Sequence, residues 1–366
     1  MSEVPVQQDE TRWLRHFSKF LCGMTLCLIF FGGQVKSHEA GLAVPDWPLT
    51  FGHNPITYPP SEWVGGVFHE HFHRLFAGVV AALTVVLAVW LKYQAPLPWL
   101  KKAGVLAVVA VLLQALLGGL TVIFQLPTLI SSSHALLAQT FLVILVVIAY
   151  GLSKERRQRV EEPEEEGENY HYRPLLKGAW ITVGLVYLQL LLGALMRHTG
   201  SGLAIPDFPT VAGRWLPFLN QSAQDWVNNW RFDQQAYAIG MPMGDVSLMQ
   251  MWIHLSHRLG ALALLIAVLY LVWRAQQEDA LPPRIWKALS LLFVLIAAQI
   301  SLGMFTLWTV KQPIITSLHV VTGAGILATS VLFLLRVWPL TDPEQHIQAQ
   351  LEDAAALHYP KSTVSE

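Results

Sequence analysis

The segment GLAVPDWP at residues 41–48 recurs later in the chain as GLAIPDFP at residues 202–209, and both copies keep a core of Pro, Asp, an aromatic residue and Pro. A second pair of motifs follows in the same order, HFHRL at 71–75 and LSHRL at 255–259. Similarity within one chain in a fixed order is the signature of an internal repeat. The chain is therefore predicted to consist of two homologous halves.

A third pair of motifs, each containing a histidine, extends this repeat. They are SSHA at 132–135 and SLHV at 317–320. One predicted helix earlier, each half carries a glutamine followed by a glycine, namely Gln114 with Gly118 and Gln299 with Gly303. The two motif histidines are 61 residues apart in the first half and 62 residues apart in the second. Such agreement in spacing is hard to produce by chance.

Composition identifies the chain as a membrane protein. Of its 366 residues, 53% are hydrophobic and only 13% are charged, whereas charged residues make up about a quarter of an ordinary soluble domain. Several apolar runs approach the roughly 20 residues that cross a bilayer as a helix. We predict an all-α integral membrane protein with eight transmembrane helices. Their expected positions are about 16–35, 72–92, 103–124, 130–150, 176–196, 252–273, 286–308 and 315–337.

The eight predicted helices divide into two four-helix bundles. The expected segments are an N-terminus at 1–15, a first half at 16–151, an acidic linker at 152–175, a second half at 176–338 and a tail at 339–366. Because each half holds an even number of helices, both halves insert the same way up. The repeat is therefore expected to be parallel, in contrast to the inverted repeats of many transporters.

The distribution of basic residues predicts the orientation in the membrane. Of the 24 Lys and Arg residues, 17 lie in the terminal segments and alternate loops, at 1–19, 92–102, 152–177, 274–287 and 336–366. We therefore expect a multi-pass protein of the plasma (inner) membrane with both termini in the cytoplasm. Both cysteines, Cys22 and Cys27, lie in the first predicted helix, so no external disulfide is expected.

Four histidines lie near the start of the helices that begin on the outer side of the membrane. They are His73, His134, His257 and His319. With a rise of about 1.5 Å per residue, all four are expected about one turn from the outer helix ends and at one depth. Histidines on facing helices of a bundle can supply the two axial ligands of a haem iron. We predict one such pair of ligands in each half.

Two alternatives remain open for these histidines. A histidine near the end of a membrane helix is often a hydrogen-bonded structural residue, although ionisable residues within spans are costly and usually functional. Zinc is the rival metal, and the additional His69 and His71 keep it open, but a pair of histidines lacks the third and fourth ligands of a zinc site. His38, His53 and His198 are expected in external loops.

The two halves differ at one position beside the histidines. EHFHR at 70–74 aligns with HLSHR at 254–258, so Glu70 occupies the position of His254. Residues three apart share a helix face, and Glu70 is therefore expected to project toward the same space as His73. A carboxylate in a partly dry site can move protons or stabilise positive charge on a substrate, so Glu70 is the predicted catalytic residue. The alternative is an N-terminal charge favoured by the helix dipole.

Four basic residues at matched positions are predicted to bind haem propionates, because guanidinium groups suit carboxylates. They are Lys36, Arg74, Arg197 and Arg258. Anchoring of helices at the membrane interface is the alternative. Asp46 and Asp207 lie in turns stiffened by proline, where capping of the turn is at least as plausible as catalysis.

This set of motifs resembles the haem A synthases of bacteria and mitochondria. The shared features are E-x-x-H-R in the second helix, H-R in the sixth, S-x-H in the fourth and eighth, and the repeated G-L-A-x-P-D-x-P loops. The resemblance covers residues 16–338. Some members carry a cysteine pair in the first external loop, which residues 36–71 lack, so a role for thiols in turnover is not expected here.

The resemblance implies oxidation of the C8 methyl of haem O to the formyl group of haem A, with water as the oxygen source, for the biogenesis of terminal cytochrome oxidase. It implies that His73 and His134 hold the haem O substrate and that His257 and His319 hold a haem b cofactor. Glu70 matches the important glutamate of the family. The expected partners are a haem O synthase that delivers the substrate and a membrane electron acceptor. Homo-oligomerisation is left open, and no nucleic acid is expected.

Two other functions remain as alternatives. A non-catalytic dihaem b cytochrome would relay electrons, but a relay has no need of an acid–base group such as Glu70 at one haem only. A haem carrier is expected to contain helices broken by Gly or Pro at matching places in the two halves, which this sequence does not show.

Overall fold

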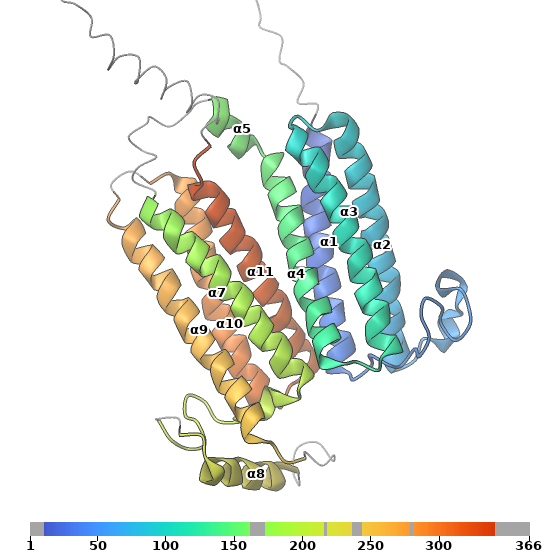
Figure 1. The fold of residues 1–366 in the computed structure, drawn as a ribbon, viewed down its shortest axis with the longest axis vertical. Coiled ribbons are helices and arrows are strands. Elements are labelled where there is room, and N and C mark those ends of the chain that lie inside the picture. Colours follow the sequence, from blue (N-terminus) through green and yellow to red (C-terminus); the bar gives the residue numbers. More distant parts are fainter. Residues whose placement is uncertain (1–10, 162–172, 216–217, 236–243, 279–280, 341–366) are drawn as a thin grey trace, which may run out of the picture.

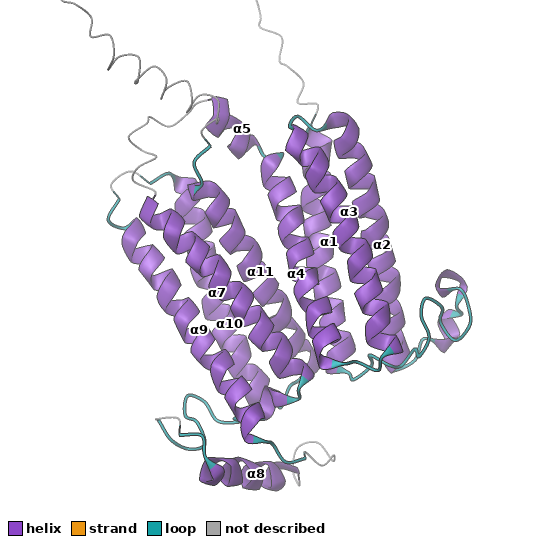
Figure 2. Ribbon diagram, in the orientation of Figure 1, coloured by secondary structure: helices purple, strands orange, loops and turns teal. Residues whose placement is uncertain are grey.

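The computed structural model describes residues 11–161, 173–215, 218–235, 244–278 and 281–340, and over these residues the fold is all-helical (Figure 1 and Figure 2). Among them, eight helices are long and apolar enough to cross a membrane. They are α1 (Arg12–Ser37), α2 (Gly66–Gln94), α3 (Pro98–Ile123), α4 (Thr128–Gly151), α7 (Arg173–His198), α9 (Leu248–Ala275), α10 (Pro283–Trp308) and α11 (Pro313–Val337). All eight predicted spans are confirmed, although each helix begins two to six residues before its predicted start.

Local sequence signals fix where these helices begin. Proline is the first residue of α3, α10 and α11. The N–H at this position makes no hydrogen bond within a helix, so proline loses nothing by lacking it. Helix α9 begins with a capping box, in which the Ser247 hydroxyl accepts from the Gln250 backbone N–H and the Gln250 side chain accepts from the Ser247 N–H. This arrangement satisfies two of the N–H groups that a helix start leaves unpaired.

The contacts between helices divide the eight spans into two groups of four. Helices α1 to α4 pack in a closed ring, and so do α7, α9, α10 and α11. Helices α1 and α4 of the first group pack against α7 and α11 of the second. A small buried cluster of Ile29, Leu142 and Ala324 joins the groups. Many large apolar side chains, including Val105 and Leu112, are more than half exposed on the outside of the bundle, as a lipid-facing surface requires.

The two ends of the bundle differ. Figure 1 shows that α2, α4, α9 and α11 all begin at the lower end, where the additional helix α8 (Gln221–Gln235) lies. At the upper end, α5 (Lys154–Glu161) is bound to α11 by an ion pair of 2.7 Å between Arg336 and Glu155. Part of the predicted linker is thus helical, whereas its acidic residues 162–170 lie outside the described residues.

Candidate functional site

The four motif histidines lie at matched places in the fold. Each is six to nine residues beyond the first residue of α2, α4, α9 or α11, which corresponds to about 9–14 Å along the helix. These four helices begin at the same end of the bundle (Figure 1). The histidines therefore lie about two turns from the helix starts. The prediction of one turn was wrong, because the helices begin earlier than hydropathy indicates.

His257 and His319 face each other across the second group of helices. Their ring centroids are 6.4 Å apart, and the ring planes are inclined by 63°. Two bonds of about 2 Å between a metal and imidazole nitrogens, together with the two ring radii, require roughly 6 Å. A single metal ion therefore fits between these rings. In the first group, His134 is close enough to His73 to act on it electrostatically.

Each of these four histidines packs against a glycine on the preceding helix. A Cβ atom at the glycine would lie only 3.0–3.3 Å from the Cε1 atom of the histidine ring. The pairs are Gly32 with His73, Gly118 with His134, Gly193 with His257, and Gly303 with His319. The sequence repeat identifies two of these glycines and misses the two on α1 and α7. Their recurrence shows that the space around all four imidazoles is built in the same way.

Glutamines on α3 and α10 hold two of the rings. The His134 Nδ1 atom lies 3.2 Å from the backbone carbonyl oxygen of Gln114, and the His319 Nδ1 atom lies 3.1 Å from the backbone carbonyl oxygen of Gln299. Because a carbonyl can only accept, each Nδ1 carries the proton and each Nε2 keeps its lone pair. This is how ligating histidines are usually oriented by a hydrogen bond from their other nitrogen.

The donor set fits a haem iron better than zinc. Each pair offers two imidazoles, and where the ring is hydrogen-bonded to a carbonyl its Nε2 is available as a ligand. Among the residues that the structure describes, no cluster of three or more His, Cys, Asp or Glu side chains is close enough to hold a metal ion. A protein site for zinc normally requires such a cluster.

Glu70 and Arg74 bind the loop that carries the first GLAVPDWP motif. Glu70 is 4% exposed. Its carboxylate accepts from the Val44 backbone N–H at 2.8 Å and forms an ion pair with Arg74. The Arg74 guanidinium also donates to the carbonyl oxygens of Val44, Asp46 and Leu49 at 2.7–3.1 Å. These bonds occupy all four terminal N–H groups of Arg74, so only its Nε–H is left for a ligand.

The second half repeats this contact with different chemistry. Arg258 donates to the carbonyl oxygens of Ile205, Asp207 and Thr210 at 2.6–2.9 Å. His254 is the counterpart of Glu70, and its Nδ1 lies 3.2 Å from the Ile205 backbone nitrogen. The His254 Nδ1 also lies 3.1 Å from the Ser201 carbonyl oxygen. Glu70 and His254 thus share one position against the loop, and only the first half has a carboxylate there.

Asp46 and Asp207 cap the turns in which they lie. The Asp46 carboxylate accepts from the backbone N–H groups of Phe51 and Gly52, both at 2.8 Å. The Asp207 carboxylate accepts from Ala212 and Gly213 at 3.0 and 2.9 Å. These contacts are the ones expected of aspartates that cap a turn.

A cluster of cations lies where the two groups of helices meet at the lower end. Arg197 at the end of α7 donates to the Gly33 carbonyl at 2.7 Å and to the Ser37 hydroxyl at 2.8 Å, both on α1. Lys311, between α10 and α11, was not identified by sequence reasoning. Burial lowers the pKa of Lys311; Glu39 opposes this effect, and the nearby charges of Lys36 and Arg197 add to it. The cluster of Lys36, Arg197 and Lys311 is therefore suited to an anion.

The additional histidines have partners of their own. His71 is fully buried, and its Nδ1 lies 3.2 Å from the Thr50 hydroxyl. The rings of His38 and His69 stack with centroids 3.9 Å apart. The structure therefore does not gather them around a common centre with His73.

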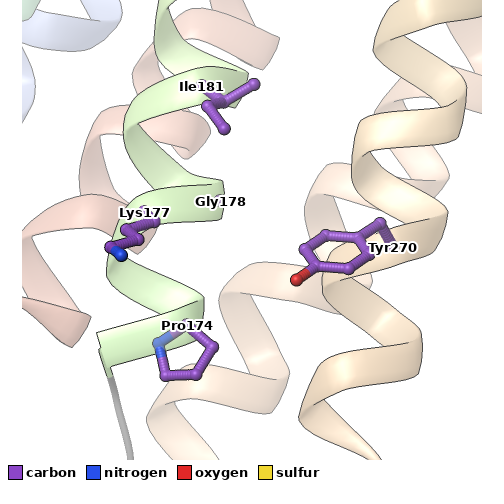
Figure 3. Close-up of a pocket in the computed structure, with 5 residues that line it drawn as sticks. All are labelled: Pro174, Lys177, Gly178, Ile181 and Tyr270. Carbon is purple, nitrogen blue, oxygen red and sulfur yellow. The ribbon is translucent and has the colours of Figure 1, made fainter.

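The structure also contains a groove far from these histidines. Its volume is about 470 Å³, and it is lined by Pro174, Lys177, Gly178 and Ile181 of α7 and by Tyr270 of α9 (Figure 3). Tyr270 lies 13 residues beyond His257 on α9, or about 20 Å along the helix. The groove is therefore separate from the histidine site.

The fold and site define a multi-pass helical membrane protein with paired intramembrane histidines, an arrangement that holds haem in helical bundles. Residues 15–331 match the COX15-CtaA family, described as cytochrome oxidase assembly protein, and the chain belongs to this family. It is 25% identical over 328 residues to the haem A synthase of Halalkalibacterium halodurans, covering 86% of this chain and 93% of that protein. It is 28% identical over 293 residues to the haem A synthase of Shewanella oneidensis, covering 76% and 83% respectively.

Proposed function

We propose that this chain acts as a haem A synthase, a membrane oxidoreductase that converts the C8 methyl group of haem O to the formyl group of haem A for the assembly of a terminal cytochrome oxidase. With water as the oxygen source, one methyl group and one water give one formyl group, four protons and four electrons. The observation that carries the proposal is the set of four glycine–histidine contacts at matched positions, in a chain of this family.

The two pairs of histidines are proposed to have different roles. His73 and His134 hold the iron of haem O in the first half, and His257 and His319 hold haem b in the second. When bound, haem b can accept electrons from the substrate and pass them to a membrane electron acceptor. The substrate is assigned to the first half because a carboxylate, Glu70, lies three residues from a proposed ligand only there.

Glu70 is proposed to act at the substrate methyl while bound to the loop. Its ion pair with Arg74 and its bond from the Val44 N–H favour the charged carboxylate. A fixed negative charge can stabilise positive charge that develops on the reacting carbon. The same position in the second half holds the neutral or cationic side chain of His254, which could not do so.

The haem propionates are proposed to bind the cluster of Lys36, Arg197 and Lys311. Arg74 and Arg258 were also expected to bind propionates, and each retains its Nε–H for this purpose, but most of their N–H groups hold the loops. The lower end of Figure 1 is proposed to face away from the cytoplasm, in the plasma (inner) membrane, with both termini cytoplasmic. Delivery of haem O by its synthase is part of the same proposal.

Expression in a host that makes haem O tests the function. Pigments extracted from cells with the wild-type chain should contain haem A or its hydroxymethyl precursor, and those from Glu70→Gln cells should contain far less. If only unmodified haem is found with the wild-type chain, the alternative of an electron-relaying dihaem cytochrome is favoured. His257→Ala should lose low-spin haem b. Retention of all low-spin haem in this variant, with its loss in His73→Ala, would overturn the assignment of the halves.

A further inference from the structure

Three of the four proposed ligands contact a glutamine on the preceding helix, and His73 does not. Each glutamine lies four residues before the glycine that touches the histidine, as Gln114 does before Gly118. On α1, the residue four positions before Gly32 is Leu28. The first helix of the first half therefore departs from a pattern that the other three corresponding helices keep.

The glutamine side chains bind the histidines directly. The Gln114 amide nitrogen donates to the His134 carbonyl at 3.0 Å, and the Gln189 amide nitrogen donates to the His257 carbonyl at 2.9 Å. The same two amide nitrogens lie 3.2–3.4 Å from ring nitrogens of those histidines.

The third glutamine makes a similar contact. The Gln299 amide nitrogen lies 3.3 Å from Nε2 of His319. Nε2 is the nitrogen assigned to the iron, so at His134 and His319 the contact that can persist with a bound metal is the one between Nδ1 and the backbone carbonyl of Gln114 or Gln299. At His257 the Gln189 amide lies 3.2 Å from Nδ1. Each of the three rings therefore has a neighbour on Nδ1 that restricts its orientation.

His73 lacks this restraint. Its Nδ1 atom is buried and has no hydrogen-bond partner among the described residues. The Leu28 side chain is partly buried against the apolar core of the first half and has no polar group. Within the described part of the chain, no hydrogen bond to Nδ1 selects a tautomer of His73 or opposes rotation of its ring.

We propose that His73 is the exchangeable ligand of the first site, and that the absence of a hydrogen-bond partner for its Nδ1 allows its bond to iron to open while the other three ligands remain in place. This inference rests on the proposed function. A substrate haem must enter and a product haem must leave, whereas a resident cofactor stays. Partners that orient a ligating histidine typically change metal affinity by about 10–100-fold. Gln189, whose amide nitrogen lies 3.2 Å from Nδ1 of His257, is thus a positioning residue.

Leu28→Gln and its matched control test this proposal. Methionine has nearly the length and shape of glutamine without the amide, so Leu28→Met controls for the change in packing. Carbon monoxide added to the dithionite-reduced protein reports on ligand opening, because it binds only an iron that has released a ligand. We expect one of the two bound haems to react in the wild-type protein and in Leu28→Met, and the rate to fall at least about tenfold in Leu28→Gln.

Gln189→Met provides the opposite test and does not depend on the folding of the Leu28 variants. Loss of the amide should make the second-half haem reactive toward carbon monoxide, so that both haems react. Equal rates in Leu28→Gln and Leu28→Met, or no gain in Gln189→Met, would overturn the proposal. These readouts concern ligation of whichever haem is bound. They stand or fall separately from the formation of haem A, which pigment extraction measures.

Discussion

At the scale of single residues, the candidate site depends on the four glycines beside the histidine rings as much as on the histidines themselves. Glycine within a helix costs about 1 kcal/mol relative to alanine, and four helices accept this cost opposite a histidine ring. Gly193 shows the reason, since a Cβ there would lie 3.1 Å from Cε1 of His257. An imidazole displaced by a few tenths of an ångström would be poorly placed to bind the proposed haem iron.

Gly193→Val is therefore expected to remove low-spin haem from the second half. The branched side chain would push His257 out of line with His319. Gly184 lies on the same helix with open space around it, so Gly184→Val is the matched control and should keep its haem. The haem content and low-spin absorption of the purified variants measure this. Equal haem loss in both variants would show that valine damages the helix and not the ligand.

Sequence alone predicted matched positions for the four histidines from the order and spacing of their motifs, and the structure places each of them six to nine residues into its helix. It could not predict what Arg74 and Arg258 bind. In the sequence, an arginine directly after a proposed ligand is as consistent with binding a propionate as with binding backbone carbonyls. Only the folded loop shows that backbone carbonyls, such as those of Val44 and Asp46, take up most of its donors. Partners on a neighbouring helix, such as Gln189 for His257, depend in the same way on helix register.

At the scale of elements, the two GLA-containing loops have one design. In each, an aspartate caps two successive N–H groups and an arginine from the following membrane helix binds three carbonyls. In the second half, a further apolar cluster that includes Val227 of α8 covers the loop. The first loop lacks α8 and depends more strongly on its polar contacts.

The first loop is expected to loosen in acid. Partial burial raises the pKa of Asp46, but bonds from the Gly52 and Phe51 N–H groups and the charge of Arg74 outweigh it, so the pKa is lowered overall. A lowered pKa in the folded state stabilises the loop above the ordinary aspartate pKa of about 4, and this stabilisation is lost as the pH falls through the lowered value. Hydrogen exchange of Phe51 and Gly52, corrected for intrinsic rates, should accelerate below about pH 4.

Asp46→Asn is the control for this dependence. The amide oxygen can still accept one bond, but it carries no charge and does not titrate in this range. The variant should show faster exchange at neutral pH and no additional acceleration in acid beyond the intrinsic rates. If its acid response equals that of the wild-type protein, another group controls the loop.

The membrane helices themselves were predictable because apolar length is a strong signal. The first residues of the helices were not, since hydropathy excludes the polar residues that the first turns contain. Helix α2 begins at Gly66 and includes His69, Glu70 and His71 before the apolar run starts. Their side chains contact residues far away in the sequence, His69 with His38, Glu70 with Val44 and His71 with Thr50, and no local window of sequence contains that information.

At the scale of the whole molecule, the two groups of helices pack closely beside the second histidine pair. Gly33 of α1 lies against α11, where a Cβ would come within 3.0 Å of Cβ and Oγ of Ser317. Ser317 is two residues from His319. Arg197 donates to the Gly33 carbonyl, so the packing of the two groups of helices and the position of the proposed ligand His319 depend on the same few atoms.

Gly33→Val is expected to weaken both the packing of the halves and the second haem site. Overpacking of a tight contact typically costs about 1–3 kcal/mol, and the displaced α11 would carry His319 with it. The thermal unfolding midpoint in detergent and the low-spin haem absorption should both fall. Gly23→Val, on the same helix with nothing within 4 Å, should change neither. If stability falls but the haem content does not, the displacement of α11 is confined to the neighbourhood of Ser317. The packing of the two groups of helices would then not affect the position of His319.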